Sequence, residues 1–193
     1  MKGEHHFKIY KPYGFLSQFV NNEQRRKNSK KLLGELYDFP KGSMAAGRLD
    51  FDSEGLLIIT TSGKFSYHIT ASGIEKEYYV QVDGLITASA IQQLQQGVEI
   101  SIHGEKYQTL ACQARLLDVA PKLPVRAKKI RDERHGPTSW ISITLTEGKF
   151  RQVKKMTSVV GFPTLRLVRY RIGNLTIQDM KSGQVEPIKR EEL

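Results

Sequence analysis

Apolar and polar positions along this chain change period several times, and each change predicts a different short element. Residues 76–83, KEYYVQVD, alternate with the period of a strand that has one buried face. Residues 56–61, LLIITT, form a continuous run typical of a strand buried on both faces. Residues 149–160 repeat apolar side chains at helical spacing and end before Gly161, which predicts an amphipathic helix. The mixture predicts an α+β fold.

Further elements follow from the same patterns and from their end signals. Thr87 is a good N-cap for a helix that ends at Gly97, and a short helix over 32–37 is expected to stop before Pro40. The region 121–137 is rich in Pro, Gly and charge, which predicts a long basic loop. Strands are also expected at residues 7–10, 109–118 and 139–146. Beyond Pro163 the apolar alternation changes phase, which predicts a strand with a bulge near residue 167.

Length and composition limit the class of protein. A chain of 193 residues with 39% hydrophobic content can bury a core, as one domain or two small lobes. The sequence has no apolar run long enough to span a membrane and no secretory signal, so we expect a cytoplasmic protein. Its single cysteine, Cys112, cannot form an internal disulfide and is expected to be a buried, inert thiol. The five histidines are dispersed and predict no metal site.

The charge of the chain indicates a polyanionic partner. The net charge is +10, and the excess is C-terminal: residues 1–100 hold 12 basic and 11 acidic side chains, residues 101–193 hold 18 and 9. From Gly148 to Gln178 there are seven Lys and Arg and no acid. A surface that only aids solubility mixes both signs, so this pattern favours binding to nucleic acid.

Residues 46–61, AGRLDFDSEGLLIITT, hold the best candidate for chemistry. Asp50 follows an Arg and a Leu, and in an extended chain it would share one face with Asp52 and Glu54, a set that could hold Mg²⁺. A calcium loop is excluded because its twelfth position, which requires Glu, is Thr61. The ordinary alternative is a solvated acidic turn before a core strand.

Four longer stretches are specific to one protein family. They are YKPYGFLSQF at 10–19, AGRLDFDSEGLLIITTSG at 46–63, KEYYVQV at 76–82 and TSWISITLTEGKFRQVKKMTSVVGFPTLRLVRYRIG at 138–173. On these stretches the chain resembles the bacterial ribosomal pseudouridine synthases of the small-subunit synthase A branch, over nearly its whole length. The first stretch begins within ten residues of Met1. We therefore expect no N-terminal S4 RNA-binding domain, and the chain resembles most the type E synthases, which isomerise a uridine in large-subunit rRNA.

The resemblance implies a fold and a set of partners. It implies an α+β fold with a curved, largely antiparallel mixed sheet in two subdomains, flanking helices and a central cleft. Residues 1–193 would be a single catalytic domain that acts on RNA as a monomer, without a membrane. The isomerisation adds no atom and changes no redox state, so the resemblance implies no cofactor and no metal.

The resemblance also implies catalytic roles. Asp50 matches the catalytic aspartate of the family, Tyr78 the tyrosine of its K-x-Y motif, and Lys154 the basic residue that pairs with the aspartate. A neighbouring cation favours the ionised carboxylate that the reaction needs. By spacing alone, Tyr78 would be a core residue and Lys154 a solvated lysine.

The target uridine is expected to flip out of stacked RNA, with four arginines holding phosphates or the displaced strand. These are Arg48, Arg151, Arg166 and Arg169. Phe150 departs from the family, which commonly has Asn in EGKNRQV, and the change could alter how this loop meets RNA. Two other hypotheses stay open: a non-catalytic rRNA-binding assembly factor, and a metal-dependent nuclease that uses Asp50, Asp52 and Glu54.

Overall fold

A computed structural model of the chain describes residues 3–20, 30–71, 73–131 and 133–193. The chain divides into two compact units. Unit 1 comprises Met1–Ile74, Pro124–Lys128 and Arg169–Leu193, and unit 2 comprises Glu75–Leu123 and Lys129–Val168. The strand β9 (Thr164–Ile172) begins in unit 2 and ends in unit 1.

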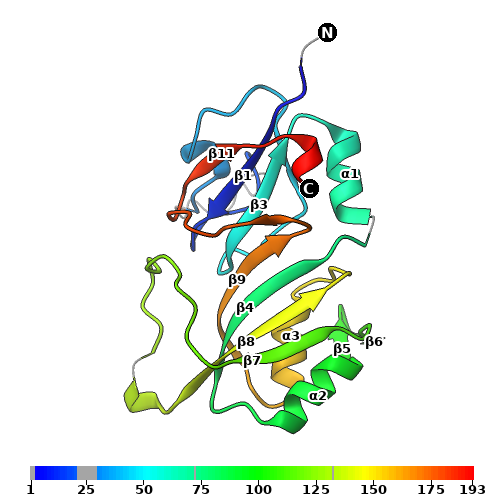
Figure 1. Ribbon diagram of the computed structural model, residues 1–193, viewed down its shortest axis with the longest axis vertical. Helices are drawn as coiled ribbons and strands as arrows, with labels where there is room; N and C mark the ends of the chain where they lie inside the picture. Colours follow the sequence, from blue (N-terminus) through cyan, green and yellow to red (C-terminus); the bar gives the residue numbers. More distant parts are fainter. Residues whose placement is uncertain (1–2, 21–29, 72, 132) are drawn as a thin grey trace. The chain divides into compact units, whose positions relative to one another are not determined.

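Among its described residues, unit 1 combines strands of a sheet with one α-helix. Its strands, apart from the end of β9, are β1 (His6–Lys11), β2 (Met44–Ala46), β3 (Glu54–Thr60), β10 (Leu175–Thr176) and β11 (Val185–Pro187). Its helices are α1 (Gly63–Ala71) and the short 3-10 helices η1 (Leu33–Glu35) and η3 (Arg190–Glu192). β1 lies between β11 and β3, as Figure 1 shows. β3 also pairs with β2 and with the end of β9, and β10 pairs with β9.

The core of unit 1 forms around β3, which is buried at every position. The continuous apolar run explains this, because neighbouring strands cover its edges and α1 packs on β2 and β3. Ile9 faces Leu57 across the β1–β3 pair, and both are fully buried. From α1, Phe65 and Ile69 are buried. Each such side chain contributes about 1.5–3 kcal/mol relative to an exposed one.

In the part of unit 2 that the structure describes, strands of a sheet are combined with a separate hairpin and two α-helices. Its strands are the start of β9 together with β4 (Lys76–Asp83), β5 (Glu99–Ile102), β6 (Glu105–Gln108), β7 (Gln113–Leu117) and β8 (Thr138–Leu145). Its helices are α2 (Ala88–Gln96), α3 (Gln152–Val159) and the 3-10 helix η2 (Glu133–His135). β8 lies between β4 and β7 in antiparallel pairing, and β5 and β6 form a separate two-stranded sheet. Figure 1 shows α2 and α3 near this hairpin, and α2 contacts β7 while α3 contacts β5.

Several predicted elements are confirmed. The fold is α+β with mostly antiparallel pairing, and β4 spans the predicted residues 76–83 with alternate side chains buried. The helix α2 has the predicted ends: the Thr87 hydroxyl accepts the Ala90 N–H at 3.2 Å, and Gly97 closes the helix with a φ of +84°. Among the described residues, no helix is long and apolar enough to cross a membrane.

Two predicted helices are wrong in extent. Over 32–37 only the turn Leu33–Glu35 is helical, because Gly34 destabilises a helix and Pro40 favours an extended residue before it. The helix expected over 149–160 begins at Gln152. Arg151 has a φ of +52°, a left-handed conformation that an α-helix cannot include, so the chain enters α3 only after it.

Three other elements differ from the sequence-based expectation. The strand expected over 109–118 is reduced to β7, and α1 and the β5–β6 hairpin were not predicted. In that hairpin both turn residues, His103 and Gly104, have positive φ, as type I′ turns require, but His is an uncommon first residue there. The turn signal was therefore weak.

Candidate active site

Asp50 lies in the tight turn that joins β2 to β3 in unit 1. The Ser53 N–H donates to the Asp50 carbonyl at 3.1 Å, and the Gly14 N–H donates to the Phe51 carbonyl at 2.9 Å. Asp50 is partly exposed, whereas Leu49 before it is buried. The chain therefore forms the short turn expected before the apolar strand, and not the extended conformation in which Asp50, Asp52 and Glu54 would share one face.

The start of this turn is fixed by a serine from the segment after β1. The Leu49 N–H donates to Ser17 Oγ at 2.9 Å, and Ser17 Oγ donates to the Leu49 carbonyl at 2.8 Å. A hydroxyl can donate one hydrogen bond and accept others, so both bonds form together. Ser17 thus satisfies both backbone groups of the residue before Asp50. Sequence reasoning did not find it, since an isolated serine in a loop carries no local signal.

A fully buried lysine lies in the same unit and was also missed. Lys11 ends β1, and its Nζ donates to the carbonyls of Pro12 at 3.0 Å and Phe15 at 2.7 Å. Burial lowers the pKa of the Lys11 amine to about 7. Three carboxylates oppose this shift, those of Glu54, Asp52 and Asp50. No local signal distinguished Lys11, because the same strand also carries the charged residue Lys8.

Glu54 is the least exposed of the three carboxylates and forms an ion pair. Its side chain is 2% exposed, and Oε2 lies 3.3 Å from Nε of Arg126. Arg126 comes from the long loop between β7 and β8, in the segment that belongs to unit 1. No group of three or more potential metal ligands exists among the described residues. The structure thus gives the magnesium interpretation of the acidic triplet no support.

Two of the predicted RNA-binding arginines belong to unit 1 and differ in exposure. Arg48 is exposed, and its carbonyl accepts from Nη1 of Arg169 at 3.4 Å. Arg169 is only 4% exposed, and its Nε donates to the Leu56 carbonyl at 2.7 Å. Its Nη2 is buried and has no hydrogen-bond partner among the residues that the structure describes. A buried donor without a partner is unusual and marks a place where a ligand oxygen would be stabilised.

The other predicted site residues belong to unit 2. Tyr78 lies in β4 opposite Ile143 of β8 and is 8% exposed. Arg151 is exposed at the N-cap of α3, and Lys154 is partly exposed one turn later. Arg166 is 8% exposed in β9. The structure therefore brings Asp50, Arg48 and Arg169 into one unit and these four residues into the other.

The segment before α3 presents aromatic and basic side chains together. Phe150 is 54% exposed and stacks on His103 with the ring centroids 5.3 Å apart. Lys155 Nζ lies 5.0 Å from the centroid of Phe150. Lys149 Nζ lies 4.9 Å from the ring centroid of Tyr107. Exposed rings beside cations are a common arrangement for contacting single-stranded RNA.

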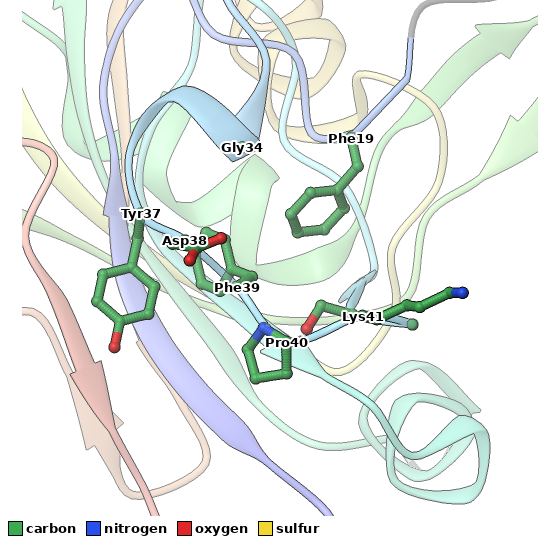
Figure 2. Close-up of a pocket in the computed structure, with 9 residues that line it drawn as sticks. Phe19, Gly34, Tyr37, Asp38, Phe39, Pro40 and Lys41 are labelled. Atoms are coloured by element: carbon green, nitrogen blue, oxygen red, sulfur yellow. The ribbon is translucent and has the colours of Figure 1, made fainter.

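Unit 1 also has a hollow with a volume of about 250 Å³. Figure 2 shows the residues that line it. Its lining consists of Phe19, Gly34, Tyr37, Asp38, Phe39, Pro40, Lys41, Gly42 and Ser43. Phe39 packs edge-on against Phe19 and Tyr37, with ring centroids 5.4 and 5.1 Å apart. None of the sequence-predicted site residues lines this hollow, so it adds nothing to the case for Asp50.

Comparisons with known proteins bear on the whole chain. Residues 5–159 match a family model described as RNA pseudouridylate synthase. Ribosomal large subunit pseudouridine synthase E of Vibrio parahaemolyticus is 40% identical over 181 residues, 93% of this chain and 71% of that protein. The protein of that name from Xanthomonas axonopodis pv. citri is 42% identical over 168 residues, 86% of this chain and 84% of that protein. A crystal structure of a pseudouridylate synthase shares the fold, with a TM-score of 0.77 at 23% identity over 100% of this chain and 73% of that one.

Proposed function

Because this chain belongs to the RNA pseudouridylate synthase family, we propose that it converts one uridine of large-subunit rRNA to pseudouridine, with Asp50 as the catalytic carboxylate. The family resemblance drawn from the sequence is confirmed by these matches. The choice of large-subunit rRNA rests on the names of the two relatives described above. The observation that carries the role of Asp50 is its turn, which is anchored on both sides while its side chain stays partly exposed.

The reaction exchanges one glycosidic bond for another. The bond from uracil N1 to the sugar C1′ breaks, the base turns, and C5 bonds to C1′ while the C5 proton leaves and N1 gains a proton. The atoms and electrons of the uridine balance, so the proposed reaction requires no cofactor. Asp50 acts either as a nucleophile or as the acceptor of a sugar proton.

The neighbours of Asp50 in unit 1 support this role. Lys11 contributes a buried amine whose electrostatic partners include the Asp50 carboxylate. Arg169 has a buried N–H that no described residue accepts, and this N–H would donate to an oxygen of the bound nucleotide. Arg48 is exposed and lies two residues before Asp50, so it would contact a phosphate of the bound RNA.

The predicted site residues of unit 2 would act on the same target uridine and its RNA strand as those of unit 1. Tyr78 would stack on the uracil or assist removal of the C5 proton, and Lys154 would favour the ionised form of Asp50. Arg151 and Arg166 would hold the RNA backbone. The exposed ring of Phe150 and its neighbouring lysine support a stacking contact with an unpaired base.

The proposed function also includes the domain organisation, the oligomeric state and the cellular location of the protein. Residues 1–193 act as one catalytic domain made of two units, and the protein works as a monomer in the cytoplasm, where bacterial rRNA is made. Sedimentation of the free protein and of its RNA complex tests the monomer. A steep salt dependence of RNA binding tests the electrostatic contribution of the +10 chain.

The decisive test is Asp50→Asn with Asp52→Asn as its matched control. Asn is nearly isosteric but uncharged, so Asp50→Asn should lower conversion of uridine in large-subunit rRNA by about 10²–10⁴-fold if Asp50 is only a base, and abolish it if Asp50 is a nucleophile. RNA affinity should stay close to that of the wild type, and Asp52→Asn should remain active. Full conversion by Asp50→Asn would reject the assignment.

The same assay separates the alternatives. Mapping of pseudouridines across rRNA from cells with and without the protein identifies the modified position. RNA binding with every uridine unchanged would instead indicate an assembly factor. Chain cleavage that stops on adding a chelator would indicate a nuclease. The ion pair between Glu54 and Arg126 argues against the nuclease, because it engages one of the three acids that a metal would need.

A further inference from the structure

Five residues of the long loop between β7 and β8 belong to a different unit from the chain on either side of them. Pro124–Lys128, called the strap below, belongs to unit 1, whereas Glu75–Leu123 and Lys129–Val168 belong to unit 2. Figure 1 shows this loop in yellow-green. Val125 in the strap is 93% exposed, and Ala127 and Lys128 are exposed as well. The hydrophobic effect therefore does not explain why the strap belongs to unit 1.

Within the strap, the side chain of Arg126 is only 11% exposed. Its guanidinium makes three kinds of contact with unit 1. Nε lies 3.3 Å from Glu54 Oε2, Nη2 donates to the Asp52 carbonyl at 3.3 Å, and Cζ lies 4.3 Å from the ring centroid of Tyr13. An ion pair, a charge-assisted hydrogen bond and a cation–π contact thus converge on one side chain.

Two of these contacts are made to the end of the Asp50 turn. Ser17 and Gly14 hold the start and middle of that turn through Leu49 and Phe51. Arg126 holds the end, through the Asp52 carbonyl and the first residue of β3. Asp50 is therefore bracketed by contacts that come from distant parts of the chain.

We propose that Arg126 is a positioning residue, and that the strap must dock through it for the Asp50 carboxylate to reach its reactive position. This inference rests on the proposed function of Asp50. Removing Arg126 would take the ion-pair partner from a carboxylate that is 2% exposed, and the turn would shift to rehydrate it. Displacement of a reacting group by about 1 Å can lower a rate about 10²-fold.

The chemistry of the contact makes arginine specific. A lysine at this position would keep the positive charge but lose the planar fork that reaches both the Glu54 carboxylate and the Asp52 carbonyl. It would also stack less well on Tyr13. Arg126→Lys should therefore restore only part of what Arg126→Ala loses.

The test compares Arg126→Ala and Arg126→Lys with Lys181→Ala, which removes one charge from an exposed position of the same unit. Single-turnover rates at saturating RNA should fall at least about tenfold in Arg126→Ala and less in Arg126→Lys. The RNA dissociation constant should change no more than in Lys181→Ala. A rate within about threefold of Lys181→Ala, or a loss confined to RNA affinity, would overturn the proposal.

A second readout does not depend on turnover. Hydrogen exchange of the segment from Leu49 to Glu54 should accelerate in Arg126→Ala, while β4 in unit 2 keeps its protection and shows that the protein is folded. Unchanged exchange in that segment would also overturn the proposal. Should wild-type protein form no pseudouridine, the proposed function would fail by itself, and the exchange experiment would still decide whether Arg126 holds the turn.

Discussion

Lys11 makes the stability of this protein depend on pH in a defined direction. Its side chain is fully buried, and burial lowers the pKa of its amine from 10.5 to about 7. Between those two values the unfolded chain binds a proton at Lys11 that the folded protein does not. The free energy of unfolding therefore rises with pH through this window and gains nothing from Lys11 below about pH 7.

The magnitude follows from the same shift. Each pH unit inside the window is worth about 1.4 kcal/mol, and the whole window is worth on the order of 5 kcal/mol. The substitution Lys11→Met keeps a long, flexible side chain but removes the titrating group. The difference in unfolding free energy between the wild type and Lys11→Met should therefore change by about 1.4 kcal/mol per pH unit.

Urea unfolding at pH 7, 8 and 9 measures this difference directly. All other titratable side chains are common to the two proteins, so the comparison isolates the contribution of Lys11 to the change with pH. Wild type should gain stability over Lys11→Met as the pH rises. Parallel curves for the two proteins, within about 0.3 kcal/mol per pH unit, would refute the assignment of a lowered pKa to Lys11.

Three further predictions concern the fold. Gly55→Ala should lower the free energy of unfolding, measured in urea, by more than about 1 kcal/mol, because its Cβ would lie 2.3 Å from the Arg169 carbonyl oxygen and its φ is +104°. Gly63→Ala, whose Cβ would have nothing within 4 Å, should not destabilise the protein. Equal losses of stability in the two variants would contradict this account. Cys112 should react slowly with a thiol reagent at pH 8 in the folded protein and rapidly in urea, because burial raises its pKa to about 11; equal rates would show that it is not shielded. Thr87→Ala should cost about 1 kcal/mol by removing the N-cap of α2, while Thr87→Ser should be nearly neutral in thermal unfolding.

Much of the fold could be predicted because its signals are local. The alternation of β4, the apolar run of β3 and the caps of α2 each lie within eleven residues or fewer, and each was predicted at or near its observed bounds. Errors arose where one residue overrode the periodic pattern. Arg151 adopts a left-handed conformation that shortens α3, and the β5–β6 turn begins with a histidine. Periodicity carries no information about such single backbone angles.

The sequence by itself determined the family, the candidate Asp50 and the short α+β elements, because motifs and hydrophobic periods are properties of neighbouring residues. Only the tertiary structure decided which side chains surround that carboxylate. Arg126 donates a hydrogen bond to the Asp52 carbonyl, which lies 74 residues earlier in the chain. Lys11 has an ionisable side chain but is fully buried in the fold. Burial and long-range ion pairs depend on tertiary contacts between residues that are far apart in the sequence, and a local sequence pattern does not specify these contacts.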